Sequence, residues 1–131
     1  EKPRYLMGVG APEDLVNGVM RGIDIFDCVL PTRLARNGAA LTRLGRLNMR
    51  KREYAADSRP VVSGCTCYCC THFTRAYVRH LFVAREILAA TLLTIHNLHL
   101  LVTLMDEMRE AIVSGSFGDW SEHFLRDMAV H

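Results

Sequence analysis

The chain has 131 residues and half of them are hydrophobic, so it is long enough to bury one small core. Its formal net charge is only +2, so the overall charge by itself does not indicate a nucleic-acid-binding protein. Its five cysteines are an odd number and four of them lie together, which argues against a secreted disulfide framework and favours a reducing, cytoplasmic setting.

The N-terminal part of the chain has the pattern of a strand, a helix and a second strand. Residues 4–9 form a short apolar run closed by Gly10, and Pro12 followed by two acids is a helix start. A second apolar run over residues 23–30 is stopped by Pro31. Two strands joined through a helix run parallel, so this part predicts a βαβ unit.

A turn signal and a basic segment follow. Asn37 and Gly38 mark a turn, and the alternation over residues 39–54 predicts a two-stranded hairpin. Residues 33–52 contain no acid and seven basic residues, namely Arg33, Arg36, Arg43, Arg46, Arg50, Lys51 and Arg52. A local excess of this kind indicates contact with a phosphate backbone, and a solvated loop face is the alternative.

From Phe73 onward the apolar residues follow the period of helices. Two apolar faces are predicted, the first made of Phe73, Tyr77, Leu81 and Phe82, the second of Leu98, Leu101, Leu104, Met105, Met108 and Ile112. Gly115 and Gly118 break the pattern before a final short helix marked by Trp120, Phe124, Leu125 and Met128. The longest apolar run, residues 87–95, is about half of the ~20 residues that a membrane span needs, and no secretory leader is recognisable, so no membrane association is expected.

A cluster of thiols predicts a metal site. Cys65, Cys67 and Cys70 have the spacing C-x-C-x₂-C, with Cys69 as a spare thiol. Three thiolates and one imidazole are a usual ligand set for structural zinc, with tetrahedral geometry and no open position. On spacing alone the fourth ligand stays open between His96 and its neighbours His72, His80 and His99. The alternative is that the thiols are buried small hydrophobes.

Asp27 is a candidate nucleophile. It follows Phe26 at the end of an apolar strand, and in parallel α/β barrels the catalytic residues come from the C-terminal ends of strands. An ionised carboxylate needs no adjacent base and can attack an anomeric carbon. A turn or cap aspartate is the alternative, and Asp24 competes for the role but lies inside the strand pattern.

Four motifs together resemble a known family. They are Tyr-Leu-Met-Gly-Val-Gly over residues 5–10, Phe-Asp-Cys-Val-Leu-Pro-Thr-Arg over residues 26–33, Ala-Arg-Asn-Gly over residues 35–38, and the thiol set with His96. In order and spacing they are similar to the C-terminal part of tRNA-guanine transglycosylase (queuine tRNA-ribosyltransferase), most of all its bacterial form, over nearly the whole chain. The resemblance implies an α/β fold: the C-terminal part of an irregular (β/α)8 TIM barrel with a zinc-binding subdomain and C-terminal helices. It divides the chain into the last βαβ unit of the barrel (1–38), the zinc-binding subdomain (39–98) and the C-terminal helices (99–131).

The resemblance also implies an activity and its residues. Members of the family exchange guanine at the anticodon wobble position of tRNA for a 7-deazaguanine, in bacteria 7-aminomethyl-7-deazaguanine, through a covalent aspartyl-tRNA intermediate in queuosine biosynthesis. Carried over by motif, the nucleophile is Asp27, the base pocket contains Tyr5, Met7 and Gly8, the RNA contacts are Arg33 and Arg36, and one structural zinc is held by Cys65, Cys67, Cys70 and His96.

The same resemblance sets limits and alternatives. The family's general acid/base lies N-terminal to the matched segment, so this chain alone is expected to be inactive. The expected partners are the tRNA anticodon stem-loop, the base, and a second copy in a homodimer that contacts near the zinc subdomain. Two alternatives remain: a non-catalytic RNA-binding or accessory zinc module of the same family, and a plain zinc-binding interaction domain.

Overall fold

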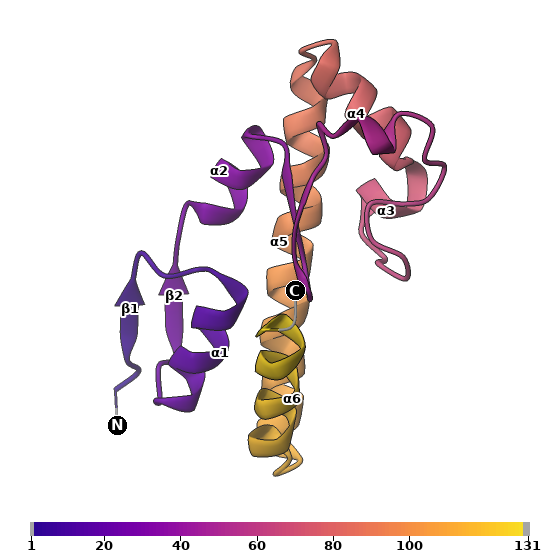
Figure 1. The fold of residues 1–131 in the computed structure, drawn as a ribbon. Helices are drawn as coiled ribbons and strands as arrows, with labels where there is room; N and C mark the ends of the chain where they lie inside the picture. The colour runs from indigo at the N-terminus through magenta and orange to yellow at the C-terminus, as the bar shows by residue number, and fades with distance from the viewer. Residues whose placement is uncertain (1, 130–131) are drawn as a thin grey trace. The chain divides into compact units, whose positions relative to one another are not determined.

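The computed structural model describes residues 2–129, so the outermost residues of the first and last predicted segments, 1 and 130–131, lie outside the described residues. Figure 1 shows the elements in chain order: β1 (Tyr5–Met7), α1 (Pro12–Met20), β2 (Ile25–Asp27), α2 (Leu30–Arg36), β3 (Ala39–Thr42), β4 (Gly45–Asn48), the 3₁₀ helix η1 (Arg52–Tyr54), α3 (Tyr68–His72), α4 (Arg75–Val83), α5 (Ile87–Val113) and α6 (Phe117–Ala129). The mixture of helices and strands agrees with the predicted α/β class.

The chain packs as two compact units, each with its own core. The strand unit comprises the residues up to Pro31, residues 43–45 and the residues from Leu101 onward. The cysteine unit comprises residues 32–42 and 46–100. The predicted segment boundaries at residues 38 and 98 stay a prediction.

In the strand unit, β1 and β2 pair in parallel, which confirms the predicted βαβ unit. The register sets Tyr5 opposite Ile25 and Met7 opposite Asp27, and Figure 1 shows the two strands side by side with α1 between them in the chain. Apolar side chains on both strands are exposed, with Tyr5 at 53% and Met7 at 73%. Parallel sheets are normally covered on both faces, and this pair leaves apolar side chains on both of its strands uncovered.

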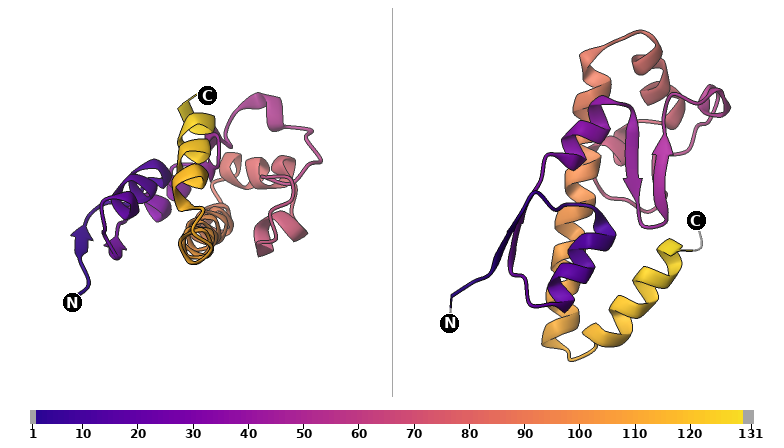
Figure 2. Two further views of the ribbon diagram at one scale, coloured as in Figure 1. Left: turned by 90° about the horizontal axis from the view of Figure 1, so that it is seen from below. Right: turned by 60° about the vertical axis from the view of Figure 1, so that its left-hand side comes forward.

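The core of the strand unit lies among the helices. Leu15 and Val16 of α1 pack with Leu104 and Met108 of α5 and with Phe124 of α6. Figure 2 shows α6 turning back from the C-terminal end of α5. The predicted face of α6 and the middle of that of α5, Leu101 to Met108, form this core, whereas the predicted Leu98 and Ile112 are exposed.

Two local predictions in this region are wrong. The second strand ends at Asp27, and Leu30 already begins α2, with Pro31 in the first helical turn rather than as a strand stop. Proline fits there because the backbone N–H groups in the first turn of a helix have no hydrogen-bond acceptor within the helix. Gly118 lies within α6 and does not break it, whereas Gly115, with φ at +74°, follows the end of α5 in the backbone conformation that glycine favours.

In the cysteine unit, β3 and β4 form the predicted hairpin, although the strands end at Asn48 instead of reaching Tyr54. The buried residues come from the hairpin, the cysteine loop, η1 and the helices α2, α3, α4 and α5. They include Met49, Tyr54, Val61, Cys67, Cys69, Cys70, Val78, Phe82, Leu92 and Leu93. The thiols are thus part of the core itself.

Helix α5 is longer than the sequence patterns suggested. It runs through 27 residues and by length and composition alone could cross a membrane, with a third of its apolar window buried. One such helix is a weak signal, because core helices pass the same test. Here α5 supplies Leu92 and Leu93 to the core of the cysteine unit and Leu104 and Met108 to that of the strand unit. We therefore regard it as a core helix.

Candidate functional sites: a metal centre and a strand-end aspartate

Four of the predicted metal-binding residues converge in the cysteine unit. One ligand atom from each of Cys65, Cys67, Cys70 and His96 lies within 4.8 Å of all the others. The distances from His96 Nδ1 to the three sulfurs are 3.7, 3.5 and 3.4 Å, in the order Cys65, Cys67, Cys70. Tetrahedral zinc, with bonds of about 2.3 Å to sulfur and 2.0 Å to nitrogen, gives N···S edges of about 3.6 Å. The cluster therefore fits one zinc ion.

The local fold explains how the thiols meet. Cys67 precedes α3 as its N-cap, and its sulfur accepts the backbone N–H of Cys70 at 3.3 Å. This short helix turns Cys70 back toward Cys67 within one turn. The chain between Cys65 and Cys70 thus forms three corners of the site, and α5 supplies the fourth.

The competing histidines are engaged elsewhere. His99 Nε2 lies 3.3 Å from the hydroxyl of Thr66, and His72 Nδ1 lies 3.0 Å from the carbonyl of Tyr68. His80 is exposed on α4. His96 is the histidine that joins the three thiols, as the family resemblance implied.

A second layer of contacts fixes the orientation of His96. Its Nε2 lies 2.9 Å from the carbonyl oxygen of Leu41 in β3. Because Nδ1 faces the thiols, Nε2 carries the proton and donates to this carbonyl, an arrangement typical of metal-bound histidine. The metal site is therefore tied to the hairpin.

Asn97 completes this connection, and the sequence analysis missed it. Its side-chain oxygen accepts the Leu41 N–H at 2.8 Å, and its side-chain nitrogen donates to the Ala39 carbonyl at 3.1 Å. His96 and Asn97 are fully buried. Two adjacent polar residues inside an apolar helix were the available signal, since buried polar groups are almost always hydrogen-bonded.

Burial determines the charge of the metal-free site. It raises the pKa of the Cys67 and Cys70 thiols and lowers the pKa of His96. Without a cation these side chains are neutral near pH 7. A bound divalent cation reverses this preference by displacing the thiol protons, so metal binding and folding are coupled.

Cys69 differs from its neighbours. It is fully buried in the core, and burial raises the pKa of its thiol to about 12. It does not belong to the group of converging ligand atoms. The structure therefore agrees with Cys69 as the spare thiol.

In the strand unit, the carboxylate of Asp27 is held at the end of β2. The Tyr5 hydroxyl donates to Asp27 Oδ1 at 2.6 Å, and the Gly8 amide lies 3.4 Å from the same oxygen. Within residues 2–129 no hydrogen bond or ion pair engages Oδ2. The bond to Asp27 is the main reason that the pKa of Tyr5 is raised above 10, so the hydroxyl stays protonated and remains a donor. Tyr5, expected as a stacking residue, thus also orients the carboxylate.

Two glycines shape the loop beside Asp27. Gly8 has φ at +74°, a conformation that other residues rarely adopt. A Cβ on Gly10 would lie 2.5 Å from the Cβ of Cys28, so only glycine lets the chain pass there. Both positions allow close approach to the strand end that carries Asp27.

Asp24 does not share this environment. Its carboxylate accepts the backbone N–H of Arg4 at 2.7 Å, where β1 begins. The Asp24 carboxylate is therefore bonded to the backbone of Arg4, and Asp27 is the carboxylate to which Tyr5 and Gly8 donate hydrogen bonds.

The predicted RNA-binding arginines belong to the other unit. Arg33 and Arg36 lie in the last turn of α2 and both are exposed. Cations at a helix C-terminus are favoured by the helix dipole. Both guanidinium groups are available to an anionic ligand.

Comparisons with known proteins show the family to which the chain is similar. A sequence model of the queuine tRNA-ribosyltransferase family matches residues 1–130. The chain is 59% identical over 126 residues to the queuine tRNA-ribosyltransferase of Pelotomaculum thermopropionicum, covering 96% of the chain and 34% of the relative. It is 56% identical to that of Caldanaerobacter subterraneus over 126 residues and to that of Neisseria gonorrhoeae over 128 residues, covering 96% and 98% of the chain and 34% of each relative. The chain thus spans about a third of the length of these curated relatives.

Proposed function

The chain belongs to the queuine tRNA-ribosyltransferase family, and from this we infer that the full-length protein is a tRNA-guanine transglycosylase. It exchanges guanine at the anticodon wobble position of tRNA for a 7-deazaguanine, with 7-aminomethyl-7-deazaguanine as the base expected for the bacterial form. The observation that carries the proposal is the Asp27 carboxylate at the end of a parallel strand, fixed through one oxygen by Tyr5 and Gly8.

The proposed reaction has two displacements at the ribose anomeric carbon. Asp27 Oδ2 forms a bond to C1′ while the bond from C1′ to guanine N9 breaks, and guanine leaves with the bonding pair and takes up a proton. N9 of the incoming base then loses its proton and bonds to C1′, while the bond from Asp27 to C1′ breaks and restores the carboxylate. The acid and base for the two proton transfers come from the part of the full-length protein outside this chain.

The role of Tyr5 follows from its hydrogen bond. By donating to Oδ1, the hydroxyl holds the carboxylate plane so that Oδ2 faces the substrate. The Tyr5 ring and the exposed Met7 line the base pocket, and Gly8 allows the base to approach the backbone closely. Arg33 and Arg36 bind the RNA near the anticodon through phosphate oxygens.

We place β1 and β2 in an irregular (β/α)8 barrel that the rest of the full-length protein completes. The exposed apolar side chains on this parallel pair support the placement, because such strands need neighbours and covering helices. The chain alone would therefore lack a closed active site and show no turnover.

The zinc is structural in this proposal. With all four positions taken by protein ligands, it supplies no vacant site for water or substrate. It stabilises the cysteine loop against α5 and, through His96, against the hairpin. Five free thiols fit a cytoplasmic enzyme that acts on tRNA.

We further infer a homodimer that uses an aromatic surface next to the metal site. The rings of Tyr68 and His72 lie 4.4 Å apart, and those of Phe73 and Tyr77 stack at 5.2 Å, with both tyrosines exposed. Clustered aromatic rings are typical interface anchors. A Tyr77→Ser variant should shift the full-length protein toward monomer in sedimentation velocity, and an unchanged dimer would place the interface elsewhere.

A denaturing gel tests the nucleophile. The full-length protein, mixed with an anticodon stem-loop RNA and the base substrate, should form an RNA adduct that survives denaturation. Asp27→Asn should form none, whereas the matched control Asp24→Asn should keep it, since the amide oxygen of an asparagine can still accept the Arg4 N–H. An adduct in Asp27→Asn would refute the nucleophile assignment. A wild-type protein that binds RNA but forms neither adduct nor exchange product would favour the accessory-module alternative.

A further inference from the structure

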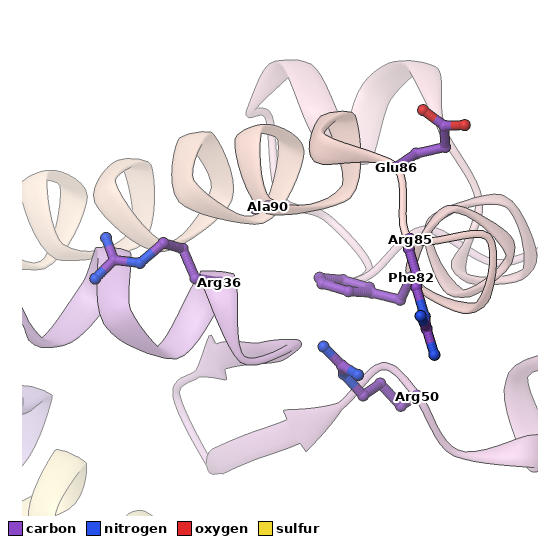
Figure 3. Close-up of a pocket in the computed structure, with 6 residues that line it drawn as sticks. All are labelled: Arg36, Arg50, Phe82, Arg85, Glu86 and Ala90. Atoms are coloured by element: carbon purple, nitrogen blue, oxygen red, sulfur yellow. The ribbon is translucent and has the colours of Figure 1, made fainter.

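The cysteine unit also contains a pocket lined by three arginines, and none of its lining residues is a metal ligand. It is an open pocket of about 330 Å³ lined by Arg36, Arg50, Phe82, Arg85, Glu86 and Ala90. Figure 3 shows the guanidinium group of Arg50 beside the Phe82 ring and the side chain of Arg85 extending toward the segment that carries Arg50. The third arginine, Arg36, lines the pocket from α2, and Figure 3 shows its guanidinium group directed away from Arg50 and Arg85.

The side chain of Arg50 is held in place before any ligand binds. Its guanidinium carbon lies 5.2 Å from the centroid of the Phe82 ring, a cation–π contact. On the other side it passes Gly38, where an added Cβ would lie 2.9 Å from Arg50 Nε. Gly38, which also has φ at +84°, has no side chain and therefore leaves the space that the Arg50 side chain occupies.

Arg85 occupies a position where glycine would be expected. It follows the C-cap of α4, and the Glu86 N–H bonds to the Leu81 carbonyl at 2.9 Å, as in a Schellman motif. The residue in this position adopts a left-handed conformation, and Arg85, with φ at +61°, is the non-glycine residue that does so among residues 2–129. An arginine here is less favourable for the backbone than glycine, and what it adds is a guanidinium group at the pocket.

The three guanidinium groups are not neutralised within the protein. In the part of the chain that the structure describes, no acidic side chain forms an ion pair with Arg36, Arg50 or Arg85. Glu86 lines the pocket, but Figure 3 shows its carboxylate directed away from Arg50 and Arg85. An anion that enters the pocket would thus meet unpaired, partly preorganised donors.

We propose that this pocket, through Arg50 and Arg85, binds a phosphate group of the RNA backbone. Phosphodiester oxygens match the planar fork of arginine, and Arg36 and Arg50 both belong to the basic segment of residues 33–52 that contains no acid. Phe82 is buried, so the pocket offers no exposed ring for stacking a base and reads the backbone rather than the sequence. The proposal rests on the proposed function, which supplies the RNA.

The salt dependence of RNA binding by the full-length protein tests the site. The probes are an anticodon stem-loop RNA with guanine at the wobble position and the same RNA with adenine there. For both RNAs, Arg50→Ala and Arg85→Gly should each weaken binding about tenfold and lower the slope of log K against log salt concentration by about 0.7 for one lost phosphate contact. The control Arg126→Ala, which removes an exposed charge from α6, should leave the slope unchanged.

Arg85→Gly separates binding from folding. Because glycine relieves the left-handed backbone, its melting temperature should equal or exceed that of the wild type while RNA binding falls. Unchanged affinity and slope in both pocket variants would overturn the proposal, as would a loss of dimer with RNA binding intact, which would assign the pocket to a protein carboxylate. If the wild type exchanges no guanine yet its binding of both RNAs depends on Arg50 and Arg85, the proposed function fails and the phosphate site stands.

Discussion

The metal centre and the strand-end aspartate differ in how much of their environment this chain provides. The metal centre is largely enclosed: three of its four ligands are buried, they come from the cysteine loop and from α5, and Leu41 orients its histidine from a third element. Asp27 lies on an exposed two-stranded sheet and is held by Tyr5 and Gly8 alone. The ligands of the first site all come from one unit, whereas the second lies on an open parallel pair of strands.

This difference indicates which properties each region controls. Disruption of the metal centre should change folding, because its ligands are also core residues. Disruption at Asp27 should change chemistry, because little packing depends on an exposed carboxylate. The predictions below test this separation, from the largest expected effect to the smallest.

The double variant Cys67→Ala, His96→Ala should show the largest effect. Structural zinc sites contribute roughly 10–16 kcal/mol in small zinc domains, as much as or more than the ~5–15 kcal/mol that stabilises a typical domain. Zinc in the full-length protein should fall from about one ion per chain to none, and amide hydrogen exchange over residues 61–72 should become fast. Full zinc content in this variant would remove the metal-centre assignment.

Asn97→Leu should cause the next largest effect, again on stability. It keeps the volume but leaves the Leu41 N–H and the Ala39 carbonyl without the Asn97 bonds, at about 1–3 kcal/mol each. Hydrogen exchange over β3 should accelerate at least tenfold while zinc stays bound. Asn48→Ala, which removes one exposed turn bond to the Arg50 amide, is the matched control and should change little. Equal exchange in the two variants would mean that Asn97 does not hold the hairpin.

The parts of these sites that sequence could predict are those set by local pattern. The C-x-C-x₂-C spacing predicted the thiol loop, and the apolar run over residues 23–30 predicted a strand in a parallel pair, although the strand ends at Asp27. Both depend on residues that are close in the chain. His96 was identified only through the family motif, because spacing alone left other histidines open.

The remaining features depend on contacts between distant segments. The bond between Tyr5 and Asp27 spans 22 residues and needs a strand register that no sequence pattern fixes. Helix α3 has five residues, too few for a visible period, and Pro31 was compatible with both a strand stop and a helix start. Arg50 and Arg85 line one pocket only because the segments after β4 and after α4 pack in one unit.

Tyr5→Phe tests the catalytic side of the comparison. The ring remains in the base pocket, but the hydrogen bond that orients Asp27 is lost, and a small misplacement of a reacting group can lower a rate about 100-fold. The rate of guanine exchange by the full-length protein at saturating RNA should therefore fall about 10- to 100-fold, with little change in the KM for RNA or in zinc content. A variant as fast as the wild type would show that the hydrogen bond from the Tyr5 hydroxyl to Asp27 does not contribute to the reaction.

Cys69→Ala should give the smallest effect, although it lies next to a ligand. The sulfur of Cys69 lies outside the group of converging ligand atoms, so no cation displaces its proton, and burial raises the pKa of this thiol to about 12. Its removal deletes one sulfur from a packed interior and should cost about 1 kcal/mol of the free energy of unfolding, with zinc still at one ion per chain. Zinc loss comparable to that of Cys67→Ala would show that the metal centre uses Cys69, and the ligand set of the enclosed site would have to be reassigned.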